Sequence, residues 1–465
     1  MSSRKNGQRQ VVAEVSAQAK ADLAEVYGLI MARNPEHDFD PTLDRVAQVC
    51  DLLGNPQDAY RSIHITGTNG KTSTARMIES LVGTYGLRTG RFTSPHLTSV
   101  TERIAIDGEP ISAERFVEVY RDIEPYLGMV DEQSIAAGGP RLSFFEVLTV
   151  MAFAAFADAP IDVAIIEVGM GGTWDSTNVV TGDIAVITPI SLDHQAWLGD
   201  SVRDIALEKS GIIKSDKIAI TAAQDEEALE VLVEAAAERG ARLIIEGTDI
   251  EVAQRLPGVG GQLVSLRTPA ALYDEIFLPL FGEHQAHNAL LALTAVEQLL
   301  AGGGSLSGDL VEQGFGAVTS PGRLEIVRSS PTIVVDAAHN AAGARALAAT
   351  IEDEFEFARL IGVVGILADK DAETILSLLE PILAEVVVTE SSSVRSMNVT
   401  DLELLAVEIF GEDRVFAAER LDEAIDIAAT RAESEDQVGV GTGTGVLVAG
   451  SVILAAEART LLGRA

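Results

Sequence analysis

The sequence predicts an α/β protein made of two doubly wound domains, each with a mostly parallel sheet. Short β-branched runs alternate with longer helical patterns from Ile63 onward, and this alternation is typical of such sheets. The alternation restarts after a Pro/Gly break at residues 320–322. With 465 residues, the chain also exceeds the size of one ordinary hydrophobic core.

In the first half, strands are predicted from apolar, β-branched runs. The run at 162–168 is almost continuously apolar, as expected for a strand that is covered on both faces. A helix is predicted at 73–85, directly after the first strand. The predicted strands lie at 63–66, 162–168, 183–188, 218–221 and 242–245, with helical segments between them.

The second half repeats the pattern. Its predicted strands lie at 332–336, 360–365, 385–389 and 446–449, and its predicted helices at 341–354, 371–379, 401–409 and 421–432. The glycines at 439–445 lack the spacing of a dinucleotide-binding turn, so we interpret them as a flexible loop. The predicted division is a flexible or helical extension at 1–20, a first domain at 21–317 and a second at 323–465.

Composition excludes several classes of function. The 34 basic and 70 acidic residues give a net charge of −36, which argues against nucleic acid as a partner. A single cysteine, Cys50, excludes an internal disulfide framework. The first residues lack the apolar core of a secretory signal, and the apolar run at 147–157 is too short to span a bilayer. We expect a cytoplasmic monomer without membrane partners.

A phosphate-binding loop follows the first predicted strand. Its glycines let successive backbone N–H groups point at one anion, and the helix start adds positive potential. Lys71 is placed to reach terminal phosphates, and the Thr72 hydroxyl to face a phosphate or its magnesium ion. Ile65 replaces the first glycine of the usual pattern, so the loop is a shortened form. The residues predicted to bind ATP here are Gly67, Thr68, Asn69, Gly70, Lys71 and Thr72.

Two more polar side chains follow predicted strands. Glu167 ends one strand and His194 follows another, at the edge where doubly wound sheets bind ligands. Alone, Glu167 also fits a solvated strand-end acid, and His194 fits a hydrogen-bonded structural histidine. Beside a triphosphate site, one carboxylate, one histidine and hydroxyls suit Mg²⁺, which favours oxygen ligands and retained waters.

Motifs along nearly the whole chain show a resemblance to a known family. The loop TGTNGKT is similar to that of the Mur ligase/folylpolyglutamate synthase superfamily, and the other motifs resemble its folylpolyglutamate synthase branch. They occur in the expected order from about Phe39 to the C-terminus. The motifs are FTSPHL (92–97), TERI (101–104), SFFE (143–146), EVGMGGTWDSTN (167–178), SLDHQAWLG (191–199), EKSGIIK (208–214), GEHQAHNA (282–289), PGR (321–323), DAAHN (336–340), DKD (369–371) and GS (450–451).

The resemblance implies a P-loop ATPase-like first domain and a smaller Rossmann-like second domain of the glutamate ligase C-terminal type. It also implies site roles. Metal ligands would be Ser94, Glu167, His194 and a carbamylated Lys209, with two Mg²⁺ ions. Further ATP contacts would be Gln285, Asn288, Arg323 and Asp336, and the catalytic residues Lys71, Lys209, Asp336 and His339. Substrate contacts would be Arg103, Phe145, Asp175 and Ser451. From the residues alone, Lys209 fits an ordinary helix lysine, Phe145 core packing and Arg103 an ion pair with Glu102.

The implied reaction is ATP-dependent ligation of L-glutamate to a folate-type carboxylate. A substrate carboxylate, on dihydropteroate or a reduced folate, takes the γ-phosphoryl group of ATP, and the glutamate amine attacks the acyl phosphate. Closure of two domains excludes water from that intermediate. Two alternatives stay open at this point, a Mur-type amino-acid ligase acting on a peptidoglycan precursor and an ATP-driven P-loop switch.

Overall fold

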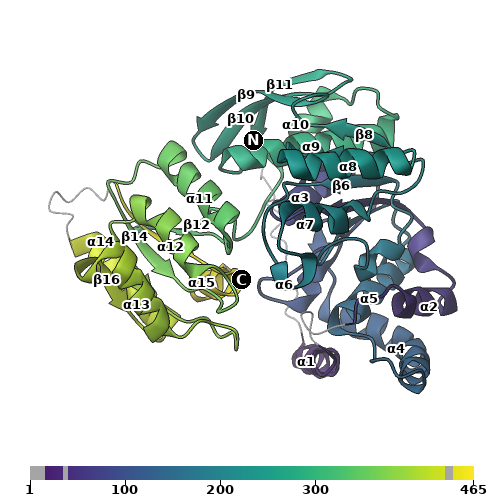
Figure 1. Cartoon of the computed structure of the whole chain (residues 1–465), viewed down its shortest axis with the longest axis horizontal. Helices are drawn as coiled ribbons and strands as arrows, with labels where there is room; N and C mark the ends of the chain where they lie inside the picture. The colour runs from purple at the N-terminus through teal and green to yellow at the C-terminus, as the bar shows by residue number, and fades with distance from the viewer. Residues whose placement is uncertain (1–15, 35–39, 435–442, 465) are drawn as a thin grey trace, which may run out of the picture.

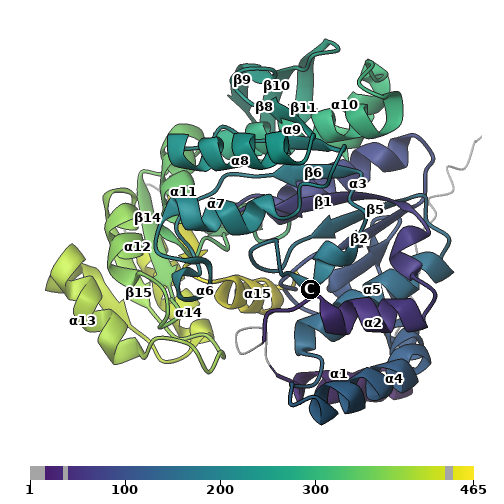
Figure 2. The same cartoon turned by 45° about the vertical axis from the view of Figure 1, so that its right-hand side comes forward.

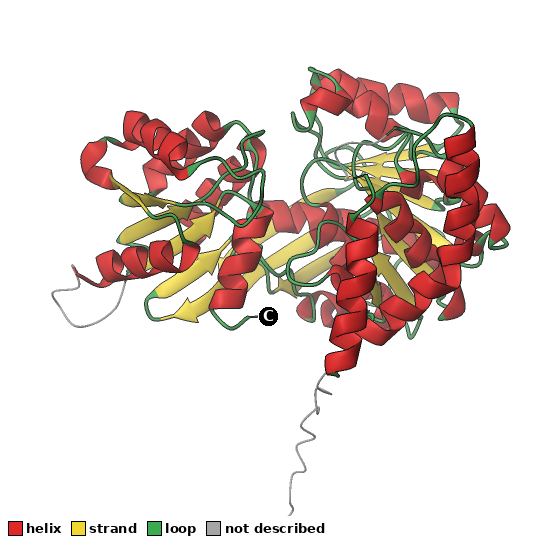
Figure 3. Ribbon diagram, turned by 90° about the horizontal axis from the view of Figure 1, so that it is seen from below, coloured by secondary structure: helices red, strands yellow, loops and turns green. Residues whose placement is uncertain are grey.

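The computed structural model describes residues 16–34, 40–434 and 443–464. Across this part of the chain, the α/β class predicted from the sequence is confirmed. An eight-stranded sheet and a six-stranded sheet belong to two bodies that lie side by side (Figure 1). Helices flank both sheets, as Figure 3 shows from below.

The larger sheet is centred on β1, which runs parallel to β5 on one side and β6 on the other. The strand order is β4-β3-β2-β5-β1-β6-β7-β8, with an antiparallel edge at β3 and β4. Because the order reverses around β1, its carboxyl end is a ligand-binding switch point. The strands are β1 (Arg61–Thr66), β2 (Thr89–Phe92), β3 (Ile104–Ile106), β4 (Glu109–Pro110), β5 (Val163–Glu167), β6 (Ile184–Ile187), β7 (Ile218–Thr221) and β8 (Arg242–Ile245).

Helices cover both faces of this sheet, so strands such as β5, β6 and β7 are largely apolar. On β5, Ile165 packs into one core with α3, α9 and α10, and Ile166 packs into another with α2, α4 and α5. The helices of this body are α2 (Asp44–Leu52), α3 (Lys71–Thr84), α4 (Ala113–Ala136), α5 (Phe144–Asp158), α6 (Gln195–Leu198), α7 (Val202–Ser210), α8 (Glu226–Glu238), α9 (Glu283–Ala301) and α10 (Gly308–Gly316).

Helix α1 (Ala17–Met31) packs against α4, below the larger sheet in Figure 2. Its start is capped by Ser16, whose hydroxyl accepts a hydrogen bond from the Ala19 N–H at 3.0 Å. Of the extension predicted at 1–20, residues 1–15 lie outside the described residues. The predicted domain limits stay predictions.

A three-stranded antiparallel sheet was absent from the sequence prediction. It consists of β9 (Glu251–Gly258), β10 (Gly261–Arg267) and β11 (Leu272–Leu278), and it packs beside α9 and α10. These strands are covered on one face only, so they lack the continuous apolar runs that predicted the central strands.

The smaller sheet has the order β12-β13-β17-β14-β15-β16, and all its pairs are parallel except β12 with β13. Helices α11, α12 and α13 pack on one face, and α14 and α15 on the other. The elements are β12 (Glu325–Ser329), β13 (Thr332–Val335), α11 (Ala341–Glu354), β14 (Arg359–Val364), α12 (Ala372–Leu379), β15 (Glu385–Val388), α13 (Val399–Phe410), β16 (Val415–Ala417), α14 (Leu421–Ser434), β17 (Thr444–Ala449) and α15 (Val452–Leu461).

The glycine-rich run before β17 was predicted to be a loop. Gly439 and Gly441 lie outside the described residues, whereas Gly445 belongs to β17, so the prediction is wrong for Gly445. A side chain there would collide with the Phe357 ring, which explains a glycine inside a strand. No helix in the described part of the chain is long and apolar enough to cross a bilayer.

Candidate active site

A cavity of about 1170 Å³ lies between the two bodies. Every residue that the sequence analysis selected for a site lines this cavity. They are Gly67, Thr68, Asn69, Gly70, Lys71, Thr72, Ser94, Arg103, Phe145, Glu167, Asp175, His194, Lys209, Gln285, Asn288, Arg323, Asp336, His339 and Ser451. The structure therefore brings together side chains that lie up to 384 positions apart in the sequence (451 − 67).

The phosphate loop connects β1 to α3 at the switch point of the larger sheet. Gly67 and Gly70 have φ values of +141° and +89°, in the left-handed region that favours glycine. A side chain at Gly67 would overlap Thr188, and one at Gly70 would overlap Asn288. The Lys71 ammonium donates to the carbonyls of Gly67 and Thr68, both at 3.1 Å, so it lies over the loop.

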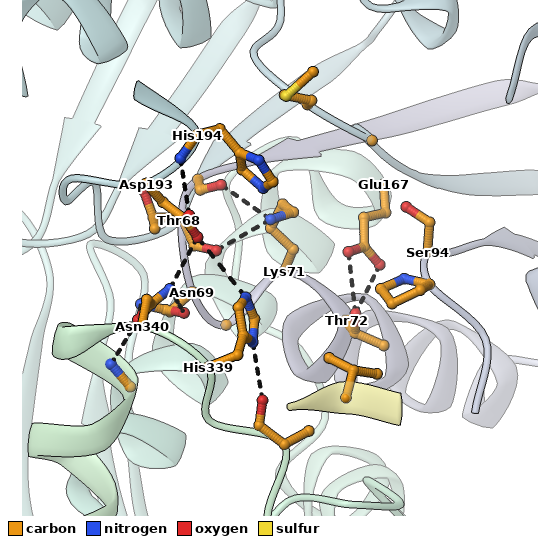
Figure 4. Close-up of a pocket in the computed structure, with 18 of the residues that line it drawn as sticks. Thr68, Asn69, Lys71, Thr72, Ser94, Glu167, Asp193, His194, His339 and Asn340 are labelled. Atoms are coloured by element: carbon orange, nitrogen blue, oxygen red, sulfur yellow. Dashed lines mark hydrogen bonds and ion pairs between the residues drawn. The ribbon is translucent and has the colours of Figure 1, made fainter. Parts of the chain in front are cut away.

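Glu167 is a buried carboxylate beside this loop. It is 1% exposed, and the Thr72 hydroxyl donates to its two oxygens at 2.9 and 3.1 Å. Burial raises the pKa of Glu167, although Lys71, Thr72 and the Ser94 backbone N–H oppose the shift. Figure 4 shows Ser94 next to this carboxylate. Because ionising Glu167 is costly at this buried position, a bound cation would stabilise its charged form.

The donor set around Glu167 fits magnesium. Among the described residues, no three His, Cys, Asp or Glu side chains gather at one point, so a ready-made all-protein cage is absent from that part of the chain. Glu167 with the hydroxyls of Thr72 and Ser94 instead offers oxygens at the phosphate loop. Mg²⁺ is typically held in this way, by few protein ligands plus phosphate and water. His194 lies on the other side of Lys71 in Figure 4.

Lys209 on α7 is buried rather than solvated. It is 4% exposed, and its ammonium donates to the Gly67 carbonyl at 2.8 Å. Burial, with a smaller contribution from Lys71, lowers the pKa of Lys209 to about 7, against the opposing charges of Asp193 and Asp175. The interpretation as an ordinary helix lysine is therefore wrong, because this side chain is buried against the phosphate loop.

On the opposite wall, Asp336 and His339 follow β13. The Asp336 oxygens accept the N–H groups of Leu324 and Ala338 at 2.9 and 2.7 Å, and burial raises the pKa of Asp336. His339 Nδ1 lies 2.9 Å from the Ala337 carbonyl, so Nδ1 carries the proton and Nε2 is an acceptor. Burial lowers the pKa of His339, which is neutral at pH 7.

Asp193 joins the two bodies. Its carboxylate lies 2.6 Å from the Lys370 ammonium and 3.8 Å from His339 Nε2, and it accepts from the Asn340 amide at 3.0 Å. Burial alone would raise the pKa of Asp193, but His194, Lys370 and His339 hold it well below its usual value. The sequence analysis assigned no role to Asp193 or Lys370, although both belong to motifs quoted above.

The phosphate loop also contacts the second body directly. The amides of Asn69 and Asn340 exchange hydrogen bonds of 3.2 and 3.1 Å (Figure 4). Asn340 is also the N-cap of α11, where it accepts from the Gly343 N–H at 2.8 Å. These hydrogen bonds therefore link the phosphate loop to the first turn of α11.

Farther from the loop, aromatic and charged groups line the cavity wall. Phe145 packs against Phe92 with ring centroids 5.6 Å apart, so core packing occupies part of its surface. Arg103 is 3% exposed; it donates to His96 Nδ1 at 3.0 Å, and its guanidinium lies 5.1 Å from the Phe144 ring centroid. A buried guanidinium of this kind fits a carboxylate ligand, and the predicted substrate contacts stay predictions.

Asp175 has a local structural role. Its oxygens accept the backbone N–H groups of Met170 and Thr177, both at 3.0 Å, and the Thr177 hydroxyl. These bonds hold the turn at 169–175 against the cavity, so Asp175 shapes the wall that it lines. Its predicted role as a hydrogen-bond partner of a heterocycle is untested.

The remaining predicted contacts cap and support helices. Gln285 donates to the Ser73 hydroxyl at 3.4 Å and so links α9 to α3 behind the phosphate loop. The Asn288 amide donates to the Gln285 side-chain oxygen on the same helix at 3.2 Å. Ser451 is the N-cap of α15 and accepts from the Leu454 N–H at 3.0 Å. Their roles toward ligands stay predictions.

Two family models match the chain. The Mur ligase middle domain matches residues 65–296, and the Mur ligase, glutamate ligase domain matches residues 322–451. The dihydrofolate synthase/folylpolyglutamate synthase of Mycobacterium tuberculosis is 50% identical over 460 residues, which cover 96% of this chain and 94% of that protein. The protein of the same name from Escherichia coli is 31% identical and covers 86% of this chain and 88% of its own.

A solved structure agrees with these matches. The M. tuberculosis folylpolyglutamate synthase complexed with ADP has a TM-score of 0.92 and 50% identity, and the alignment covers 96% of this chain and 99% of that one. Both halves of the chain are thus matched by sequence and by structure. The chain belongs to the Mur ligase family, in its branch of dihydrofolate synthases/folylpolyglutamate synthases.

Proposed function

We propose that this chain is an ATP-dependent ligase that adds L-glutamate to a folate-type carboxylate and releases ADP and phosphate. One observation carries the proposal: a single cavity holds the phosphate loop of one body and the Asp336–His339 wall of the other. Relatives that bear folylpolyglutamate synthase names support the folate acceptor over a peptidoglycan precursor. The glutamate ligase domain of the second half argues against a simple ATP switch.

In the proposed reaction, a carboxylate oxygen of the acceptor attacks the γ-phosphorus of ATP, and the bond to the β,γ-bridging oxygen breaks. Lys71 offsets the charge of the phosphates, and backbone N–H groups of the loop orient them. The glutamate amine then attacks the acyl carbon and phosphate leaves. We assign the amine proton to His339 Nε2, which is neutral and is stabilised by Asp193 once protonated.

Magnesium is part of the proposal. Thr72, Ser94 and Glu167, with His194, would hold Mg²⁺ beside the phosphates, where the ion screens their charge. A second ion would use Lys209 after carbamylation. In that step the neutral amine forms an N–C bond to CO₂ and loses a proton, which leaves a carbamate anion. The lowered pKa of Lys209 supports the step, because only the neutral amine is nucleophilic.

The proposal is tested by the substrate dependence of phosphate release. We expect phosphate release from ATP to require both L-glutamate and a pteroate acceptor. Dihydropteroate and tetrahydrofolate, assayed separately, separate addition of the first glutamate from chain extension. Phosphate release that is indifferent to both substrates would overturn the ligase proposal. The cytoplasmic location and the monomeric state stay predictions.

A further inference from the structure

A second, smaller cavity of about 40 Å³ lies behind the phosphate loop, at the junction of the two bodies. Thr72 and Arg76 of α3, Thr93 and Glu102 line it from the first body, and Ser320 and Arg323 line it from the second. At roughly 10–15 Å³ per water, this space holds about three waters or one small oxyanion.

Arg76 is the unusual group in this cavity. Among the residues that the structure describes, no carboxylate, carbonyl or hydroxyl lies within hydrogen-bond or ion-pair distance of its guanidinium. The Arg76 side chain is half-buried, and a guanidinium carries five N–H donors, so these donors are left for water or a ligand. Burial, with the neighbouring charge of Arg91, lowers the pKa of Arg76 to about 10. Glu79, Glu102 and Glu167 lie near enough to oppose this shift, but none of them forms an ion pair with Arg76 in the described structure, and the side chain borders the small cavity.

The other charges that line the cavity leave an excess of positive charge. Glu102 is the carboxylate there, but its two oxygens already accept the N–H groups of Leu97, Thr98 and Ser99 at 2.8–2.9 Å. Arg323 contributes a second guanidinium, whose one hydrogen bond in the described structure is a 3.5 Å contact to the Gly322 carbonyl. The lining itself thus carries two guanidinium groups against one carboxylate, and further carboxylates such as Glu167 lie outside the lining.

Neutral donors complete the environment. The Thr93 hydroxyl accepts from Arg91 at 3.0 Å, which leaves its own proton for another acceptor. By contrast, the Thr72 hydroxyl donates to Glu167, and the Ser320 hydroxyl pairs with Ser73 at 3.0 Å. An oxyanion in the cavity would thus meet Arg76, Arg323 and Thr93 as available donors.

We infer that this cavity binds a small oxyanion, with Arg76 as its principal ligand. Two sources fit the reaction proposed above: a carboxylate of the incoming glutamate and the phosphate that is released. Both share the chemistry of a compact oxyanion that accepts from a guanidinium fork. The choice between these sources rests on the proposed ligase function, whereas the anion site itself does not.

The test compares Arg76→Gln and Arg76→Lys with Arg242→Gln, a control at an exposed arginine of β8. We expect Arg76→Gln to raise the KM for L-glutamate or the inhibition constant for phosphate at least about tenfold, and Arg76→Lys to retain part of the affinity. A raised KM alone identifies the carboxylate, and weakened phosphate inhibition alone identifies phosphate. If neither value changes by more than the control's, the inference is wrong.

A second measurement needs no turnover. The melting temperature is recorded with inorganic phosphate or L-glutamate in Lys71→Ala, which removes the lysine of the phosphate loop, and in Lys71→Ala with Arg76→Gln. We expect one of these ligands to raise the melting temperature of the first protein but not of the second. Equal shifts in both proteins would overturn the anion site. If the unsubstituted enzyme makes no glutamylated product while these Arg76-dependent shifts are observed, the ligase function is refuted and the anion site is kept.

Because Arg76 makes no hydrogen bond or ion pair with any described residue, its replacement should leave the melting temperature without ligand unchanged or higher. A purely structural arginine would behave in the opposite way, since its loss would strand its partners. A large fall in the unliganded melting temperature of Arg76→Gln, without any change in either ligand constant, would therefore assign Arg76 to folding and contradict the inference.

Discussion

Replacing Asp193 by asparagine should separate the contribution of domain closure to catalytic activity from the contribution of the phosphate loop. The Asp193 carboxylate lies in the first body, 2.6 Å from the Lys370 ammonium of the second, and the side chains are only 9% and 8% exposed. Asparagine keeps the shape but removes the charge. It also places an amide donor near the Asn340 amide, which now donates to Asp193 at 3.0 Å.

Breaking one partner of a buried ion pair costs about 3–5 kcal/mol, because the other charge stays buried and unpaired. The two side chains keep a slight exposure to solvent, which screens the pair a little, so we take the lower limit of about 3 kcal/mol. At 1.4 kcal/mol per factor of ten, kcat/KM should fall by about 100-fold if the closed arrangement is the reactive one. Steady-state phosphate release at saturating ATP, with varied glutamate, measures this fall.

The chain offers a matched control. Asp369 is the neighbour of Lys370 and pairs with Arg395 at 2.6 Å, but these side chains are 45% and 40% exposed. Exposed pairs contribute about 0–1 kcal/mol, so Asp369→Asn should change kcat/KM by less than about fivefold. A double-mutant cycle with Lys370→Met tests the coupling. Equal effects of Asp193→Asn and Asp369→Asn would refute the reasoning.

Three further predictions concern the phosphate loop and its neighbours. The pKa of Lys209 is lowered to about 7, so the neutral amine becomes dominant above that pH. Activity in a phosphate-release assay should therefore rise with added bicarbonate above pH 7. Lys209→Arg should abolish both the activity and the response to bicarbonate. The pKa of Glu167 is raised in the folded state, so ionisation of Glu167 costs stability as pH rises above its unfolded value. Glu167→Gln should lower kcat at least about 100-fold, whereas the melting temperature of this variant at pH 8 should stay equal to or above that of the parent. A melting temperature several degrees below that of the parent would contradict this account. Gly70→Ala should weaken ATP binding at least about tenfold and destabilise the fold by about 1–3 kcal/mol, because the φ of Gly70 is +89° and Asn288 fills the space that a side chain would need. Calorimetric titration with ATP measures the affinity, and thermal unfolding measures the stability. An ATP affinity equal to that of the wild type would contradict the prediction.

The central strands and the phosphate loop could be predicted because their sequences reflect local physics. The strand at β5 is apolar on both faces, and Gly67 and Gly70 adopt backbone conformations that other residues disfavour. The meander β9–β11 could not be predicted by the same reasoning, because a strand covered on one face lacks that run. Gly445 was assigned to a loop for a similar reason. A glycine is needed there because of the Phe357 ring, which is distant in sequence.

The residues of the site also fall into those that the sequence predicted and those that it could not. Strand-end position, together with the neighbouring phosphate loop, pointed to Glu167 and His194, and both line the cavity. The burial of Lys209 depends on how α7 packs against the phosphate loop, which its helical sequence does not reveal. The Asp193–Lys370 pair joins residues 177 positions apart, from separate bodies, so only the tertiary structure identifies the partners.

The central claim is that amide formation proceeds through an acyl phosphate made from the acceptor carboxylate. Oxygen-18 in that carboxylate tests the claim most directly. The proposed reaction transfers one labelled oxygen to phosphate for each glutamyl bond formed, and mass spectrometry reads the phosphate and the product together. We predict labelled phosphate in a one-to-one ratio to the glutamylated product. Unlabelled phosphate beside a glutamylated product would contradict the mechanism.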